Sequence, residues 1–369
     1  MKIAAGRFGR SMLVFLLFPY LLVLASSAQE PADPNKSVSY KQRPELAAEV
    51  LQSWYNPDTG LYRTTGWWNS ANAITVLADY SRVSGSRKYR SVFSNTFTAA
   101  QKTSTGFLNK FYDDEGWWAL AWIDAYGITH DARYLSMAES IFTDMSGGWD
   151  NTCSGGIWWS KDRKYKNAIA NELFLDVAAQ LALHAKRSRD RVGYREWAEK
   201  EWHWFSQSGM INSDHLVNDG LDESCSNNHK TTWSYNQGVI TGGLAELSRS
   251  DSDPGLLTRA DEIAAAAIAH LTDSQGILHD SCEPDCGADG TQFKGIFARN
   301  LTILEKIQPR PDMERFLQTN DDSVWAQVKG KDYRLGPVWS APYGTADASS
   351  QSSAMDLLVA AAAISKKAK

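Results

Sequence analysis

Apolar residues recur at helical spacing through most of the chain, with polar residues between them. Similar series lie near residues 43–54 and 256–273. The clearest one runs through Tyr134, Met137, Ala138, Ile141, Phe142 and Met145. Spacings of three and four residues place these side chains on one stripe of an α-helix. These segments are therefore predicted to be amphipathic helices that bury one face.

A second kind of segment is apolar nearly all round. The stretch 118–126 and the stretch that contains Leu173, Phe174 and Val177 have no polar face, which indicates helices that are buried on every side. The two kinds alternate along the chain. Amphipathic segments lie near 43–54, 87–104, 130–146, 191–207, 256–273 and 311–328, and the more buried segments that follow them lie near 67–83, 115–127, 167–186, 234–249, 291–306 and 350–365.

This alternation predicts an all-α fold that is built from a repeated helix pair. The period is about fifty to sixty residues, and no strand-like segment of useful length interrupts it. We expect an (α/α)6 toroid of six outer and six inner helices, with the inner helices parallel. The loops that precede the inner helices would then meet at one end and line a common cavity.

These loops are rich in Trp, amides and carboxylates. The chain has 15 Trp, and three Trp-Trp pairs stand where inner helices are expected to begin. Aromatic faces stack on sugar rings, while amides and Trp N–H groups bind hydroxyls. The alternative is that these Trp fill the centre of the toroid, and we expect one member of each pair to face the cavity. The side chains that we expect to bind a sugar are Trp67, Asn72, Trp117, Trp118, Trp159, Tyr235, Gln237 and Lys294.

Two adjacent carboxylates, Asp113 and Asp114, stand just before the buried helix that we expect to start at Gly116. Cleavage of a glycosidic bond needs two carboxyl groups in different protonation states. A helix N-terminus favours an ionised carboxylate, while repulsion between close carboxylates raises the pKa of one of them. Acidic residues before a helix are often only caps. The position of this pair among aromatic loops is what favours a catalytic role.

The first residues resemble a signal peptide. Three cations precede an apolar run from Met12 to Ala25, and small residues around Ala28 suit cleavage after that position. Removal of residues 1–28 takes three cations away and changes the net charge from −5 to −8, which argues against a nucleic-acid partner. We expect a polar tail over 29–42 and one catalytic domain over 43–369, with no transmembrane segment in the mature chain. We also expect a secreted monomer, in the extracellular space or the cell wall.

Four cysteines enter an oxidising compartment, where an even number favours disulfides. Of the three possible pairings we favour Cys153 with Cys225 and Cys282 with Cys286. Sequons at Asn35 and Asn300 allow N-glycosylation, and the first is the more credible. No His-x-x-x-His spacing, nucleotide-binding loop, dinucleotide fingerprint or Gly-x-Ser-x-Gly motif is present. We therefore expect no metal and no cofactor.

The chain closely resembles glycoside hydrolase family 76, the α-1,6-mannanases, and especially its fungal members. The matching stretches extend over nearly the whole mature chain. They are Gly66-Trp-Trp-Asn-Ser-Ala-Asn-Ala73, Tyr112-Asp-Asp-Glu-Gly-Trp-Trp-Ala-Leu-Ala-Trp122, Gly155-Gly-Ile-Trp-Trp-Ser160, Lys166-Asn-Ala-Ile-Ala-Asn-Glu172, Trp233-Ser-Tyr-Asn-Gln-Gly238 and Asp289-Gly-Thr-Gln-Phe-Lys-Gly-Ile296. Such a series is far more specific than any single motif.

The resemblance implies an (α/α)6 fold and a retaining mechanism on α-1,6-linked mannose. It makes Asp113 the nucleophile and Asp114 the acid/base, with the two carboxyl groups roughly 5 to 5.5 Å apart. The alternatives are a cell-wall transglycosylase and a non-catalytic mannan-binding protein. Some fungal relatives have a hydrophobic tail for a lipid anchor, whereas the short apolar stretch from Met355 to Ser365 ends in charge. We interpret that stretch as the last inner helix.

Overall fold

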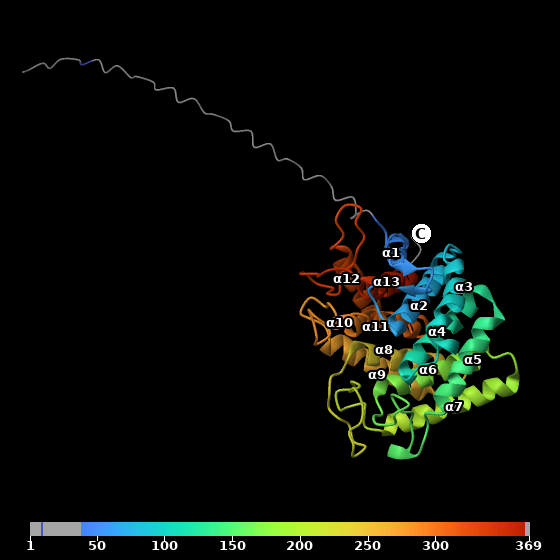
Figure 1. Cartoon of the computed structure of the whole chain (residues 1–369). Helices are drawn as coiled ribbons and strands as arrows, with labels where there is room; N and C mark the ends of the chain where they lie inside the picture. Colours follow the sequence, from blue (N-terminus) through green and yellow to red (C-terminus); the bar gives the residue numbers. More distant parts are fainter. Residues whose placement is uncertain (1–8, 10–37, 366–369) are drawn as a thin grey trace, which may run out of the picture.

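The computed structural model describes residues 9 and 38–365. Two kinds of long helix alternate along this part of the chain (Figure 1). The outer helices have one buried stripe, as in α5, where the buried residues recur at helical spacing. Their bounds are α1 (Arg43–Gln52), α3 (Arg90–Ala99), α5 (Ala132–Ser146), α7 (Ser188–Gln207), α9 (Pro254–His270) and α12 (Pro311–Trp325).

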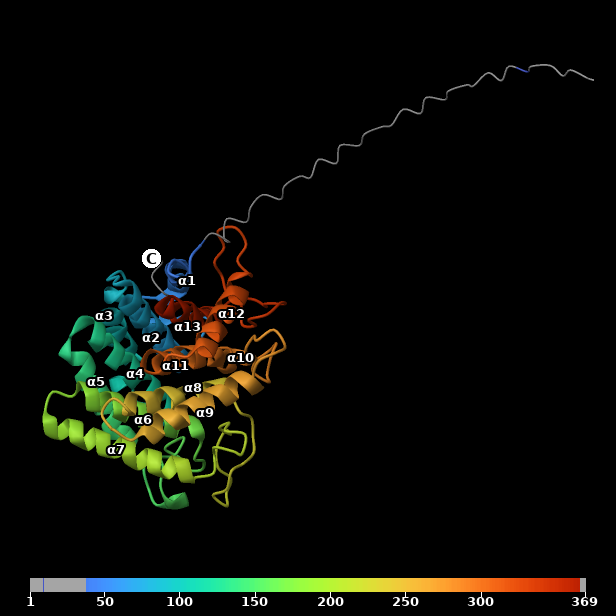
Figure 2. The same ribbon diagram turned by 180° about the vertical axis from the view of Figure 1, so that it is seen from behind.

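Six inner helices form the ring within them. Each contacts the next in chain order, and α13 contacts α2, so the ring closes. The front view and the view from behind show the outer helices around this ring (Figures 1 and 2). The bounds of the inner helices are α2 (Trp67–Ser84), α4 (Tyr112–Thr129), α6 (Ala168–His184), α8 (Ser234–Leu247), α11 (Phe293–Ile307) and α13 (Ala348–Ile364). The predicted (α/α)6 toroid is confirmed.

The sequence explains why the inner helices lie inside. In α13 every residue from Ala348 to Ala362 is buried, as expected of a helix without a charged face. Glycine lets neighbouring inner helices approach closely. A Cβ on Gly295 would lie 2.3 Å from the carbonyl oxygen of Ser353 on α13, and one on Gly238 would lie 2.6 Å from the Cα of Phe297 on α11.

Short elements occupy the connections. Strands β1 (Tyr55–Asn56) and β2 (Leu61–Tyr62) form an antiparallel hairpin between α1 and α2. One helical turn, α10 (Gly287–Gly290), precedes α11. Three 3-10 turns complete the described elements: η2 (Ala100–Lys102), η3 (Thr105–Phe107) and η4 (Thr152–Ser154). We call the end of the toroid where the inner helices begin the front end and the opposite end the rear end.

The structure confirms the favoured disulfides, Cys153–Cys225 and Cys282–Cys286. It does not agree with a glycan at Asn300, because this residue lies within α11, is 4% exposed and donates its amide to the carbonyl of Ile296 at 2.9 Å. None of the described helices is long and apolar enough to cross a membrane. The predicted signal peptide at 1–28, the sequon at Asn35 and most of the predicted polar tail lie outside the described residues.

Candidate active site

The carboxylate pair lies in the first turn of α4, at the front end. The helix begins at Tyr112 and not at Gly116, so Asp113 and Asp114 are helical residues whose carboxyl groups lie near unpaired backbone N–H groups. The backbone N–H of Tyr112 donates to the carbonyl of Trp159 at 2.9 Å. This bond joins the start of α4 to the loop that contains the third Trp pair.

Asp113 is held by an aromatic N–H group. The indole Nε1 of Trp159 donates to Oδ2 of Asp113 at 2.9 Å, while Oδ1 is buried with no hydrogen-bond partner among the described residues. Burial, strengthened by the charge of Asp114, raises the pKa of Asp113 to about 8, against the opposing effect of the Trp159 bond. This carboxyl group therefore has a hydrogen-bond donor on one oxygen and a free second oxygen.

Asp114 has an amide partner. Nδ2 of Asn109 donates to its Oδ2 at 2.5 Å. Burial raises the pKa of Asp114 to about 6, the Asn109 bond lowers it, and the negative charge of Asp289 raises it further. Two neighbouring carboxyl groups with raised pKa values hold a proton between them near neutral pH. One of them can then donate that proton while the other is ionised.

A wall of stacked rings stands beside the pair. The ring of Trp68 lies 5.6 Å from that of Trp117 and 6.4 Å from that of Phe293, and both contacts are stacked. Tyr235 stacks on Phe293 at 3.8 Å. The Nε1 of Trp68 also donates to Asp289 at 2.8 Å. Because Trp117 lies in α4 three residues after Asp114 and stacks on Trp68, the rings and the carboxyl pair lie at the same end of the toroid.

Of the Trp residues that were predicted to contact a sugar, some lie beside the carboxyl pair and others pack in the core. Trp159 is 37% exposed and contacts the pair. Trp117 is buried under Trp68. Trp118 is wrong as a sugar contact, because it is fully buried and stacks on Trp122 in the core. Half-buried Trp67 packs on Trp118 at 4.9 Å, on the core side of its pair.

Three predicted polar contacts are used by the protein itself. Gln237 is fully buried and exchanges hydrogen bonds with the backbone of Val217 at 2.7 and 2.9 Å. Lys294 is 1% exposed and forms an ion pair with Glu283. Buried Asn72 accepts a hydrogen bond from Arg299 at 2.8 Å and donates to the carbonyl of Trp68 at 3.3 Å. These side chains are structural, because their polar atoms already have partners.

Two other carboxyl groups near the pair have separate surroundings. Glu115 is buried, accepts from the backbone N–H of Asn109 at 3.1 Å and from Lys161 at 2.8 Å, so it fixes the loop that positions Asn109. Glu172 on α6 is fully buried, and neither carboxyl oxygen has a partner among the described residues. Burial, with the charge of Asp219, raises the pKa of Glu172 well above its usual value.

Buried contacts hold the loop that contains Trp159. Lys166 is buried, and its Nζ donates to Asp150 at 3.0 Å and to three backbone carbonyls of this loop at 2.7 to 2.9 Å. Gly156 has φ +79°, and a Cβ there would lie 2.3 Å from the ring of Trp204. The disulfide from Cys153 closes the loop onto the segment before α8. Trp159 is therefore presented by a constrained backbone.

Sequence reasoning missed Asn109, Trp68 and Asp289 as site residues. Trp68, in the first turn of α2, and Asp289, in α10, stand in stretches whose composition is unusual, and that was the available signal. The sequence around Asn109 offered none. Within residues 38–365, no group of three or more His, Cys, Asp or Glu side chains is arranged to hold a metal ion.

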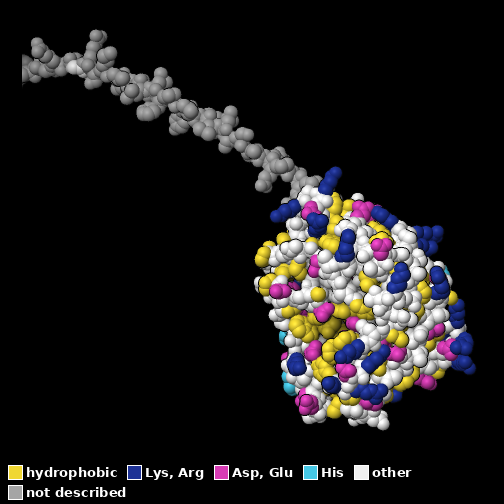
Figure 3. Space-filling model, in the orientation of Figure 1, with side chains coloured by type: hydrophobic (Ala, Val, Ile, Leu, Met, Phe, Trp, Pro, Cys, Tyr) yellow, Lys and Arg dark blue, Asp and Glu magenta, His cyan; other side chains and the backbone are white. Residues whose placement is uncertain are grey.

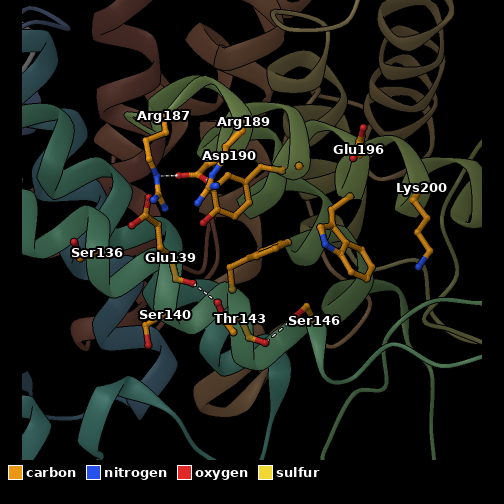
Figure 4. Close-up of a pocket in the computed structure, with 14 residues that line it drawn as sticks. Ser136, Glu139, Ser140, Thr143, Ser146, Arg187, Arg189, Asp190, Glu196 and Lys200 are labelled. Carbon is orange, nitrogen blue, oxygen red and sulfur yellow. Dashed lines mark hydrogen bonds and ion pairs between the residues drawn. The ribbon is translucent and has the colours of Figure 1, made fainter.

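Two hollows lie away from the carboxyl pair. One, of about 900 Å³, lies between outer helices α5 and α7, with charged Arg187, Glu139 and Asp190 along it (Figure 4). Another, of about 490 Å³, lies at the rear end. Neither Asp113 nor Asp114 lines either of these two hollows.

The face in Figure 3 is also hollowed near its middle, where hydrophobic side chains gather beside acidic ones.

Comparison with known proteins agrees with this geometry. Residues 39–369 match the family model of glycosyl hydrolase family 76. The Candida albicans protein named mannan endo-1,6-alpha-mannosidase DFG5 is 26% identical over 331 residues, which are 80% of this chain and 72% of that protein. The GH76A alpha-1,6-mannanase of Salegentibacter sp. HEL1_6 has a TM-score of 0.79 at 25% identity, covering 88% of this chain and 99% of that chain.

An inactive variant of the same Salegentibacter mannanase, with two successive aspartates changed to asparagine, has a structure in complex with alpha-1,6-mannotriose. That chain is 24% identical to this one, again with a TM-score of 0.79. The family match extends over almost all of the described helices. The chain is thus a glycoside hydrolase, and it belongs to glycosyl hydrolase family 76.

Proposed function

We propose that this hydrolase cleaves internal α-1,6-mannosidic bonds of mannan with retention of configuration. The observation that carries the proposal is the carboxyl pair Asp113 and Asp114, in which each carboxyl group has its own hydrogen-bond donor, beside a wall of stacked rings. Its relatives support the substrate, because the Candida albicans protein is named a mannan endo-1,6-alpha-mannosidase and the Salegentibacter protein an alpha-1,6-mannanase. Flat rings suit the C–H faces of mannose, and the pair suits acid and nucleophile.

We assign the nucleophile to Asp113 and the acid/base to Asp114. In the first step a carboxylate oxygen of Asp113 bonds to the anomeric carbon while the glycosidic C–O bond breaks and Asp114 gives its proton to the departing oxygen. In the second step Asp114 takes a proton from water, whose oxygen attacks the same carbon and releases Asp113. Two inversions at one carbon retain its configuration.

In the unliganded site burial raises the pKa of both Asp113 and Asp114, so the pair retains a proton near neutral pH. The first step needs that proton on Asp114, with Asp113 ionised. A glycosidic oxygen beside Asp114 accepts a hydrogen bond only from the protonated acid and so raises its pKa. We expect bound mannan to favour the form in which Asp114 is protonated and Asp113 is ionised.

Incubation with unbranched α-1,6-mannan, followed by measurement of new reducing ends, tests the activity. Azide then distinguishes the two roles. In Asp114→Ala, azide should resolve the covalent intermediate and give a mannosyl azide of retained configuration, whereas in Asp113→Ala it should attack directly and give the inverted azide. If the two variants gave the opposite configurations, Asp114 would be the nucleophile and Asp113 the acid/base. No reducing ends from wild type, or full release by Asp113→Ala, contradicts the proposal.

A labelled mannose oligosaccharide added as acceptor shows whether water or a sugar hydroxyl completes the second step. Label in longer products would indicate transglycosylation. Mannan that binds without any product over a broad pH range would indicate a binding protein.

We further infer that the protein is secreted. Two disulfides in the described structure support an oxidising compartment. Expression of the full chain in a secreting host, followed by N-terminal sequencing of protein from the medium, tests this inference. The first residue should be Gln29, and retention of the whole protein inside the cell would contradict it.

A further inference from the structure

A cavity at the rear end has no part in the mechanism above. Its volume is about 490 Å³, within the range of small-molecule sites. All six inner helices contribute to it, with lining residues that lie between the middle and the C-terminal end of each helix, from Thr75 on α2 to Ala363 on α13. The C-terminal ends of helices have partial negative charge, so this end of the toroid favours a cation.

The charged groups around the cavity leave one negative charge unmatched. The lining contains five carboxylates and four Arg or Lys side chains. The arginines are already paired with four of the carboxylates. Arg82 forms ion pairs with Asp79 and, at 2.6 Å, with Asp124. Arg249 pairs with Glu246 at 2.5 Å, and Arg299 pairs with Asp356 at 3.2 Å.

Asp176 on α6 is the carboxylate without a cationic partner. It is 2% exposed, and its Oδ1 accepts from the neutral amide of Gln180 at 2.9 Å. Its Oδ2 makes no hydrogen bond to any described residue. Burial, with the nearby charges of Glu246 and Asp124, raises the pKa of Asp176 to about 7, although Arg299 opposes this. His184 supplies no cation, because burial lowers its pKa.

The wall between these polar groups is apolar. Leu120, Ile123, Val359 and Ala360 line the cavity together with Asp176. Arg82 and Arg249 are about half exposed, which places the mouth of the cavity at the surface. A small molecule in the cavity would therefore contact apolar side chains along its length and the unpaired Oδ2 of buried Asp176 at one end.

We propose that the rear cavity binds a small organic cation, with its ammonium group on Oδ2 of Asp176 and its hydrocarbon body against the apolar wall. The ammonium donates to Asp176 and balances the unmatched charge. This site is separate from the mannan site, since its lining includes neither a member of the carboxyl pair nor a ring of the aromatic wall.

Isothermal titration with 1,6-diaminohexane at 150 mM salt tests the proposal, and 1,6-hexanediol is the neutral probe of the same length. We expect the diamine to bind and the diol not to bind. Asp176→Asn should weaken diamine binding at least tenfold without loss of mannan hydrolysis. Asp214→Asn removes an exposed charge outside the cavity and should change the affinity less than twofold.

A second variant covers the case in which Asp176→Asn does not fold. Ala363→Trp narrows the cavity from a half-buried position near the end of α13 and should also weaken diamine binding at least tenfold. The proposal is overturned by no diamine binding at 10 mM, by equal binding of the diol, or by affinities of folded variants within twofold of wild type. These outcomes are independent of mannan hydrolysis, which reports only on the front end.

Discussion

Removal of the indole donor from Asp113 provides a test of how the pair is tuned. Trp159→Phe keeps an aromatic ring but deletes the N–H that donates to Asp113 at 2.9 Å. A hydrogen bond to a charged group contributes about 1.5 to 3 kcal/mol, and 1.36 kcal/mol corresponds to one pKa unit. Because this bond stabilises the ionised form, its loss should raise the pKa of Asp113 by about one to two units.

The expected result is a shift of the acid limb of the pH profile. On the acid side of the kcat/KM profile, activity requires that Asp113 lose its proton while Asp114 keeps its own, so the rate there follows the microscopic pKa of Asp113 in the free enzyme. A higher pKa moves this limb to higher pH, so kcat/KM on the acid side should fall about 10- to 100-fold by the same arithmetic, while the difference narrows at higher pH. The measurement is initial-rate hydrolysis of α-1,6-mannan between pH 4 and 9.

Trp158→Phe is the matched control. The Nε1 of Trp158 donates to Asp150 at 2.7 Å in the same loop, but this carboxylate is not in the catalytic pair. The acid limb of the Trp158→Phe profile should stay within a few tenths of a pH unit of the wild-type limb. An unchanged limb in Trp159→Phe, or equal shifts in both variants, would refute the assigned effect of the indole on Asp113.

Three further predictions concern stability, measured as the free energy of unfolding in urea. The double variant Cys153→Ser with Cys225→Ser should lose about 4 kcal/mol, since the two cysteines are 72 residues apart. Gly295→Ala should lose about 1 to 3 kcal/mol because its Cβ meets α13, whereas Gly193→Ala, with open space and a helical backbone, should gain about 0.5 to 1 kcal/mol. Lys166→Met should lose about 3 kcal/mol or more, because it leaves three carbonyls without their donor. Equal stability of each variant and wild type would contradict these values.

Helical periodicity was sufficient to predict the toroid. The predicted segments and the observed inner helices differ mainly at their ends, as with α4, which begins at Tyr112. The acidic first turn misled the prediction because Asp113 and Asp114 resemble residues that precede a helix. Acidic residues suit the first turn of a helix as well as the positions before it, so the local sequence does not give the residue at which α4 begins.

The side chains of the site were harder to predict than their loops. Adjacent residues on a helix point about 100° apart, so Trp67 and Trp68 cannot both face the pair, and the sequence does not say which one does. Long polar side chains such as Gln237 and Lys294 suited a sugar site equally well. Their actual partners, the backbone of Val217 and the carboxylate of Glu283, lie 20 and 11 residues away in sequence, in connecting segments whose conformation the helical pattern does not give.

The contact between α13 and α2 has a consequence for the order of folding. The two helices are separated by more than two hundred residues, yet each completes the environment of the other. A ribosome therefore releases α2 long before its second inner neighbour exists, and one flank of this apolar helix stays uncovered during most of synthesis. Final closure of the ring has to wait for residues 348–364, so we expect the apolar flank of α2 to become covered only after the last helix has been made.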